Sequence, residues 1–232
     1  MTVVQNQLIA GLPRRERESL LAVCKPVPLE SGAVLCDPGE PTHHVYFPID
    51  GFISLVAVVD GEPKLEVGMV GREGMLGAQL VLGVSRVPLR ALVQGAGMAH
   101  RVTTAHFRRQ LSASEILRSR LERYVCVLMM QLATSAGCTR FHDIDSRLAR
   151  WLLMSQDRAH AANFHLTHEF LAYMLGVRRV GITKAAGDLQ RSGLVRYRRG
   201  EITVLDRAGL QAATCSCHAA DCNAYVRTLG HR

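Results

Sequence analysis

The apolar positions between residues 114 and 136 recur with the period of an α-helix. Leu117, Leu121, Tyr124, Leu128 and Leu132 follow at steps of four, three, four and four. This spacing puts the five side chains on one face of a helix of about 23 residues, roughly 35 Å long at 1.5 Å per residue. The face can pack on the helix's own domain, or it can pair with a second copy of the chain. We favour a parallel homodimer through these five residues, with Val125 and Met129 widening the contact.

The first hundred residues alternate short β-prone runs with chain-breaking residues. All eight prolines lie at or before Pro88, and eleven of the twenty glycines fall between Gly32 and Gly97. Short strands between glycine corners are typical of a small barrel or roll. We expect a helix over residues 13–23 and then strands over residues 45–48, 52–58, 65–69 and 90–93.

A second helical pattern, from Leu166 to Gln190, is broken once by a turn. Ala172, Gly176 and Ile182 lie four and then six residues apart. This spacing is typical of two helices that cross steeply over a short turn containing glycine, as in a helix-turn-helix. Thr167 supplies a side-chain oxygen that can cap the first helix. The alternative is an ordinary helical hairpin with a basic, solvated face.

The residues after this helix pair favour the helix-turn-helix. Gly193 follows the second helix, where glycine commonly ends one. Two short β-prone runs then follow, at residues 195–197 and 202–205, joined by Arg198-Arg199-Gly200-Glu201. A helix pair followed by a basic hairpin predicts a winged helix.

The charge distribution points to a polyanionic partner. From Arg140 onward, fourteen Lys and Arg face eight Asp and Glu, a balance of +6, whereas the first 139 residues have fourteen against twelve, a balance of +2. A basic surface on one module is the electrostatic signature of nucleic-acid binding. The side chains we expect to contact DNA are Thr167, Arg178, Arg179, Val180, Thr183, Lys184, Arg191, Arg198 and Arg199.

The overall composition excludes several classes of protein. At 232 residues with 48% hydrophobic content, the chain can build substantial cores. It contains no apolar run of membrane-spanning length and no apolar signal core, so we expect a cytoplasmic protein without membrane contact. No nucleophile elbow, metal pair or phosphate loop is present, so we expect no catalytic residues and no enzymatic activity.

The order of these parts resembles the Crp/Fnr family of bacterial transcription regulators over nearly the whole chain. Besides the helix-turn-helix, the resemblance rests on Gly39-Glu40, His44-Val45-Tyr46-Phe47 and Gly71-Arg72-Glu73-Gly74-Met75-Leu76-Gly77. It implies an α+β fold with an N-terminal cyclic-nucleotide-binding-like β-roll, a long central dimerisation helix and a C-terminal winged helix-turn-helix. The corresponding expected segments are 1–111, 112–138 and 139–212, followed by a cysteine-containing tail over 213–232.

The resemblance implies three partners: double-stranded DNA, a second copy of the chain and RNA polymerase. It places Arg179 and Lys184 at base-reading and phosphate-reading positions of a family member. Val180 stands where that member has an acidic reader of cytosine. An apolar side chain cannot accept a hydrogen bond from cytosine but can contact a thymine methyl group, so the operator should differ.

The resemblance also suggests where an effector would bind. Members that bind cyclic AMP carry a Gly-Glu-Leu pattern followed by Arg-Ser, and here the matching residues are Gly77, Ala78 and Gln79, then Arg86. Ala78 lacks the carboxylate that holds the ribose, so cyclic AMP in the usual mode is not expected. Arg86 or Arg90 can pair with another anionic effector, or both can be ordinary exposed charges. We expect no cofactor beyond a small-molecule effector of unknown identity, or regulation without one.

The seven cysteines are an odd and scattered set, which argues against a disulfide framework. Cys24 and Cys36 are too few and too far apart for the N-terminal iron–sulfur cluster of some family members. The C-terminal residues Cys215, Cys217, His218 and Cys222 are weak candidates for zinc, because Cys-x-Cys is not the usual Cys-x-x-Cys knuckle. The main hypothesis is a homodimeric, sequence-specific transcription regulator, and the alternative is a metal- or redox-responsive DNA-binding sensor that uses these cysteines.

Overall fold

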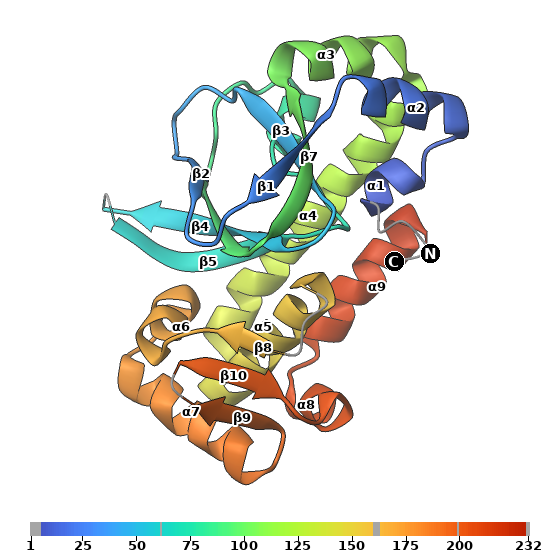
Figure 1. The fold of residues 1–232 in the computed structure, drawn as a ribbon. Coiled ribbons are helices and arrows are strands. Elements are labelled where there is room, and N and C mark those ends of the chain that lie inside the picture. The colour runs from blue at the N-terminus through green and yellow to red at the C-terminus, as the bar shows by residue number, and fades with distance from the viewer. Residues whose placement is uncertain (1–5, 61, 160–162, 199, 231–232) are drawn as a thin grey trace.

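The computed structural model describes residues 6–60, 62–159, 163–198 and 200–230. It consists of an N-terminal β-roll, a long helix that runs behind the roll, and a C-terminal domain of helices with a small sheet (Figure 1). This is the mixed α and β architecture predicted from the sequence. Two short helices, α1 (Gln7–Ala10) and α2 (Arg14–Ala22), precede the roll, and α2 corresponds to the helix predicted over residues 13–23.

The β-roll is built from two antiparallel sheets. One has the strand order β1-β7-β3 and the other β2-β6-β4-β5. A short 3-10 helix, η1 (Ala78–Leu82), connects β5 to β6, and α3 (Thr104–Ala113) follows the last strand. The strands are β1 (Lys25–Leu29), β2 (Val34–Cys36), β3 (His44–Pro48), β4 (Phe52–Val59), β5 (Glu62–Val70), β6 (Arg90–Gly95) and β7 (Gly97–Thr103).

The four predicted strands correspond to β3, β4, β5 and β6, whereas β1, β2 and β7 were missed. Pro26 and Pro28 obscure β1, but β1 is the edge strand of its sheet, where proline is tolerated because one side of the strand needs no hydrogen bonds. In β7 only Ala99 and Val102 are buried, so the strand lacks a clear apolar alternation.

The long helix α4 (Glu115–Phe141) begins where predicted and ends five residues later than predicted. Ser114 caps its first turn by accepting a hydrogen bond from the Leu117 amide at 3.1 Å. The helix continues without a break through Gly137 to Phe141. None of the described helices is both long and apolar enough to cross a bilayer.

The apolar stripe of α4 faces the chain's own β-roll. Leu117, Leu121 and Tyr124 are at most 3% exposed and pack in one core with residues of β3 and α3. Leu128 packs against the cores of the roll, and Leu132 is half-buried at the edge of a cavity in the roll. The prediction that Leu117, Leu121 and Tyr124 form a dimer interface is therefore wrong, because burial in their own domain leaves them no surface for a partner.

The C-terminal domain follows α4 through a short connection. Its core joins α5, α6, α7 and the three-stranded sheet β8-β10-β9, with Leu148, Leu171 and Ile182 fully buried. The elements are α5 (Ile144–Ala159), β8 (Asn163–His165), α6 (His168–Leu175), α7 (Arg179–Arg191), β9 (Val195–Arg198), β10 (Glu201–Val204), α8 (Arg207–Ala213) and α9 (Cys217–Leu229).

The expected C-terminal tail forms a packed helix. Helix α9 runs beside α4, towards α1 (Figure 1). Tyr225 and Leu229 enter the same core as Leu8 near the N-terminal end of the described chain. The C-terminal residues therefore pack against the long helix and complete the core near the N-terminus.

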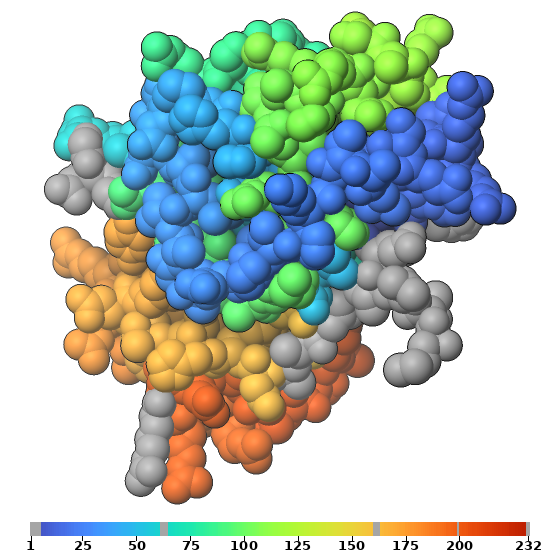
Figure 2. All heavy atoms as spheres, turned by 45° about the horizontal axis from the view of Figure 1, so that its top comes forward, coloured from blue at the N-terminus to red at the C-terminus, as the bar shows by residue number. Residues whose placement is uncertain are grey.

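The β-roll and the C-terminal domain are in direct contact, and Figure 2 shows the blue and green roll lying against the orange residues of the C-terminal domain. Phe52 and Met69 of the roll share a core with Trp151 of α5. Trp151 Nε1 donates to Glu66 Oε1 at 3.0 Å. A buried ion pair joins Arg158 Nε to Glu73 Oε1 at 2.8 Å, so both apolar and charged contacts fix the two domains.

We predict that Arg158→Met lowers the free energy of unfolding by about 3–5 kcal/mol, because it leaves the Glu73 carboxylate buried without a charged partner. The matched control is Arg14→Met, which breaks a pair whose side chains are 83% and 61% exposed. That change should cost less than about 1 kcal/mol. Urea unfolding of the two variants checks the prediction, and equal losses of stability would contradict it.

Glu66 should make the domain contact pH-dependent. Burial raises the pKa of Glu66 from 4.5 to about 7, although hydrogen bonds from Ser54 and Trp151 and the charge of Arg158 oppose the rise. Because the Glu66 carboxyl ionises less readily in the folded than in the unfolded state, its contribution to stability is full below pH 4.5 and is lost as the pH rises through 7. The free energy of unfolding of the neutral variant Glu66→Gln, relative to that of the wild type, should therefore rise by on the order of 2–3 kcal/mol between pH 5 and pH 8. Urea unfolding at the two pH values measures this difference, and parallel pH profiles would refute it.

Candidate DNA-binding site

The predicted helix-turn-helix is formed by α6 and α7. Thr167 caps α6, since its hydroxyl accepts a hydrogen bond from the Phe170 amide at 3.1 Å. Gly176 ends α6 with φ 61° and ψ 40°, the left-handed conformation that glycine adopts without a Cβ clash. The Val177 amide then donates to the Ala172 carbonyl at 2.9 Å and closes the turn. The cap and the turn residue predicted from the sequence are both confirmed.

The two helices pack through the residues whose spacing predicted them. Ala172 is 6% exposed and Ile182 is fully buried in the core of the domain, together with Leu171. Because these side chains turn inward, α7 presents its opposite side to solvent, at the end of the molecule away from the β-roll (Figure 1). We call this exposed surface the recognition face; it consists of Arg178, Arg179, Val180, Thr183 and Lys184.

The recognition face combines positive charge, free backbone donors and one apolar side chain. The first turn of α7 contains no acidic residue, and none of the described side chains caps its amides. A helix N-terminus of this kind attracts phosphate through its dipole and its free N–H groups. Val180 is 72% exposed, which is unusual for valine in a folded domain and suits contact with a thymine methyl group.

A small network holds the recognition face against the wing. His168 stacks on Tyr197 with ring centroids 4.3 Å apart, and its Nδ1 lies 3.1 Å from the Thr183 hydroxyl. Tyr197 in turn donates from its hydroxyl to the Leu166 carbonyl at 3.0 Å. Burial and the nearby charge of Arg179 lower the pKa of His168, which favours a neutral ring at neutral pH. Sequence reasoning missed His168, because nothing in its local pattern distinguishes it from a surface histidine.

The hairpin after α7 forms the predicted wing, and β8 adds a third strand to it. Arg198 lies exposed on β9. Arg191 pairs with Asp188 one turn earlier, yet its side chain remains 72% exposed. Arg199, also predicted to contact DNA, lies outside the described residues.

The β-roll encloses a cavity of about 340 Å³ against α4. Gly77, Ala78 and Gln79, the residues matched above to the effector-binding segment, line this cavity. Gln79 Nε2 donates to the Thr42 hydroxyl at 2.8 Å. Most of the remaining lining is apolar and includes Leu35, Leu55, Met75, Leu82, Leu89 and Leu132.

The two arginines proposed for an anionic effector do not line this cavity. Arg90 forms an ion pair with Asp37, with Nε 2.5 Å from Oδ1. Arg86 is exposed and donates to the Gly39 carbonyl at 2.5 Å. Both guanidinium groups are thus engaged by acceptors of the roll itself, which favours the alternative that they are ordinary exposed charges.

The C-terminal candidates for a metal site divide into two groups. Cys215 and Cys217 lie with Cys138 and His142, whereas His218 and Cys222 lie with Asp157. Sequence analysis missed Cys138 and His142, although their spacing of four residues at the end of a helix places both on one face and could have drawn attention to them.

Comparisons with known proteins agree with this architecture. Residues 146–213 match the Crp-like helix-turn-helix domain. The chain is 24% identical over 191 residues to the global nitrogen regulator of Synechococcus elongatus, covering 78% of this chain and 86% of the relative. The solved structure of FixK2 from Bradyrhizobium japonicum superposes with a TM-score of 0.69 at 14% identity, covering 83% of this chain and 98% of the other.

A transcriptional regulator of the CRP/FNR family from Thermus thermophilus superposes with a TM-score of 0.57 at 24% identity, covering 82% of this chain and 97% of that one. These similarities extend over the β-roll and the long helix as well as the C-terminal domain. Residues 146–213 are therefore a Crp-like helix-turn-helix domain, and the chain as a whole has the fold of the solved CRP/FNR-type structures.

Proposed function

We propose that the protein is a homodimeric, sequence-specific regulator whose α7 enters the major groove of DNA. The observation that carries this proposal is the recognition face, where basic side chains surround an uncapped helix N-terminus. Arg178 and Arg179 lie at the start of the helix and Lys184 lies further along the same exposed side. Arginine suits guanine edges and lysine suits phosphates, so the face can both read bases and hold the backbone.

The wing supports the same mode of binding. Arg196 and Arg198 are exposed on β9 and add positive charge next to α7. The contact of His168 with both Thr183 and Tyr197 ties the wing to the recognition helix. Because the wing and α7 are already held at a fixed angle, less conformational entropy is lost when both bind the duplex.

The proposed dimer uses the residues of α4 that the β-roll leaves exposed. Exposed residues recur there at helical spacing: Cys126, Met129, Met130, Ala133 and Ala136. Met129 and Met130 are 63% and 44% exposed, and no described element covers them. A second copy of α4 in parallel orientation would cover this face and would place two α7 helices on one side, matched to half-sites about 34 Å apart.

The β-roll cavity offers a site at which a small molecule could regulate the proposed dimer. Val125, Leu128 and Met129 of α4 border the cavity, and Met129 also belongs to the proposed dimer face. A molecule in the cavity would therefore touch the dimer helix directly. The apolar lining favours a largely apolar effector over a cyclic nucleotide, whose phosphate would find no arginine among the lining residues. RNA polymerase is the expected further partner of the DNA-bound dimer.

Variants of the recognition face test the DNA-binding proposal. After selection of a bound sequence from random duplexes, Arg179→Ala should weaken binding about 10- to 100-fold and relax specificity at one position. Lys184→Ala should weaken binding to all sequences and reduce the salt slope by about 1. Fluorescence anisotropy at several salt concentrations measures both effects.

The control for these variants is Arg15→Ala, which removes an exposed charge from α2. It should leave affinity nearly unchanged. Wild-type affinity in both recognition-face variants would contradict the assignment of α7. Selection with and without cyclic nucleotides tests the effector inference, because enrichment only with a nucleotide would oppose an apolar effector.

A charged substitution on the exposed side of α4 tests the proposed dimer interface. Met129→Glu should raise the dimer dissociation constant at least about tenfold, because pairing would bury two carboxylates against apolar neighbours. Met98→Glu, which alters a methionine 38% exposed on β7, is the control and should remain dimeric. Sedimentation equilibrium measures both variants. If the Met129→Glu protein dimerises like the wild type, the pairing surface lies elsewhere.

A further inference from the structure

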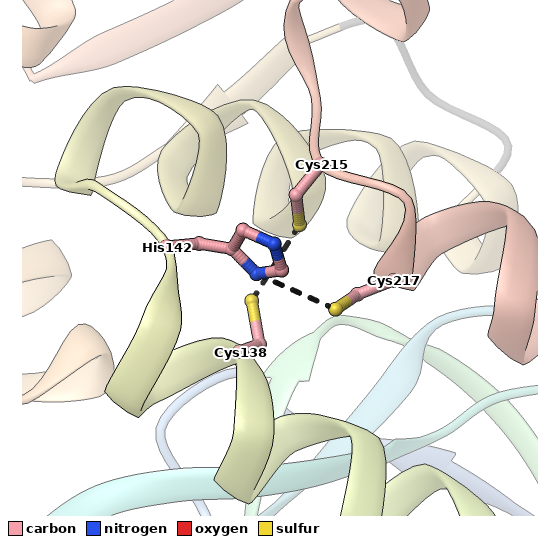
Figure 3. Close-up of side chains that lie close together, drawn as sticks. All are labelled: Cys138, His142, Cys215 and Cys217. Atoms are coloured by element: carbon pink, nitrogen blue, oxygen red, sulfur yellow. Dashed lines mark hydrogen bonds between the residues drawn. The ribbon is translucent and has the colours of Figure 1, made fainter.

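Four metal-binding side chains meet where the long helix joins the C-terminal domain (Figure 3). Cys138 lies in the last turns of α4, and His142 follows the helix directly. Cys215 lies between α8 and α9, and Cys217 is the first residue of α9. We call these four residues the junction cluster. The two halves come together although more than seventy residues separate them in the chain, since Cys138 and Cys215 are 77 residues apart.

The spacing of the junction cluster matches a tetrahedral metal site. The Sγ atoms of Cys138 and Cys215 are 3.6 Å apart, and Cys217 Sγ is 3.6 Å from His142 Nδ1. All four donor atoms lie within 4.8 Å of one another. A zinc ion bonded at about 2.3 Å to sulfur and about 2.0 Å to nitrogen separates its ligands by roughly 3.6–3.8 Å. The donors therefore need only small adjustments to surround one ion.

Burial and the neighbouring charges favour an anionic zinc–thiolate complex at this place. Cys138 and Cys215 are 2% and 9% exposed, and Cys217 and His142 are half-buried. Zinc held by three thiolates and one imidazole carries a net charge of about −1. The buried guanidinium groups of Arg147 and Arg150 lie close enough to interact with the cysteines, and they would offset that charge.

A disulfide does not account for the cluster. Cys138, Cys215 and Cys217 form no disulfide bond in the structure. The distance of 3.6 Å between Cys138 and Cys215 is far longer than the bond of about 2.05 Å in a disulfide. A disulfide would also leave Cys217 and His142 without a role.

We propose that Cys138, His142, Cys215 and Cys217 form a Cys3His site that binds one zinc ion per chain. Three soft sulfur donors and one imidazole select zinc over hard cations such as magnesium and calcium. Four protein ligands leave no open coordination position, so the ion is structural. It joins the end of α4 to the start of α9 and thereby fixes the connection through which the C-terminal domain is held.

The neighbouring group of Asp157, His218 and Cys222 is explained without a metal. His218 Nε2 lies 3.1 Å from one Asp157 oxygen, and Arg207 lies 2.5 Å from the other. Arg207 and His218 therefore engage both oxygens of the Asp157 carboxylate, so that only His218 and Cys222 remain, too few donors for a structural zinc site.

The test is the metal content of the full-length protein, purified with a thiol reductant and without chelators. Elemental analysis should find about one zinc ion per chain in the wild type. Cys217→Ser and His142→Ala should each lose most of it, because removal of a direct ligand costs more than the roughly 10- to 100-fold loss of affinity seen for outer-shell partners. Cys126→Ser, at an exposed cysteine of α4, and Cys222→Ser are the controls and should retain the ion.

Cobalt binding provides a second readout that needs no variant. Apo wild-type protein titrated with Co²⁺ should develop the intense visible absorption of a tetrahedral site together with thiolate-to-cobalt charge transfer. Weak absorption typical of six-coordinate cobalt would overturn the proposal. So would a metal-free wild type in which peptide mapping finds Cys138 linked to Cys215, or a Cys222→Ser protein that loses zinc as fully as Cys217→Ser.

The measurements of metal binding do not depend on DNA binding. Arg179→Ala should keep its zinc while losing affinity for DNA, since Arg179 lies on the recognition face rather than in the junction cluster. Chelation should also lower the melting temperature of the wild type but not that of Cys217→Ser. Failure of the metal proposal would thus leave the DNA-binding proposal intact, and the reverse holds equally.

Discussion

The packing of one face of α4 into the β-roll is the constraint on which the rest of the structure depends. Leu117, Leu121 and Tyr124 are buried in the core of the roll, so the first half of the helix cannot rotate without breaking that core. Since α4 is continuous to Phe141, its second half inherits the same orientation. The burial of the N-terminal half therefore sets which side of the helix is exposed for a partner and where the C-terminal domain begins.

The C-terminal domain is held at three places around this helix. The roll contacts α5 through Glu66, Trp151 and a shared apolar core. The ion pair of Glu73 and Arg158 joins the same two units. Helix α9 returns along α4 and reaches the N-terminal helices. A change in the roll cavity, which α4 borders, can thus act on the position of α7 through packed elements rather than through a flexible linker.

The junction cluster lies at the one turn where α4 gives way to α5, close to the beginning of α9. Its four donors come from two chain segments that pack only because α9 lies along α4. An ion at this point would add a fixed link to a junction otherwise held by side-chain packing and by the ion pair of Arg150 with Asp221. The junction would then resist the rotation that a helix-to-domain connection usually allows.

The sequence by itself determined the parts whose signals are local. Thr167, Ala172, Gly176 and Ile182 specify the helix-turn-helix within sixteen residues, because caps, left-handed turns and helical spacing are short-range effects. The winged hairpin, the long helix and four strands of the roll follow from the same kind of pattern.

Tertiary packing decided the rest. A stripe of leucines shows that a helix has an apolar face, but only the neighbouring core decides whether that face meets its own domain or a partner. Edge strand β1 contains two prolines that local pattern alone treats as breakers. Arg90 was a plausible ligand group until its ion pair with Asp37 placed it outside the cavity. Cys138 and Cys215 have no shared motif, and they meet only because two distant segments fold against the same end of α4.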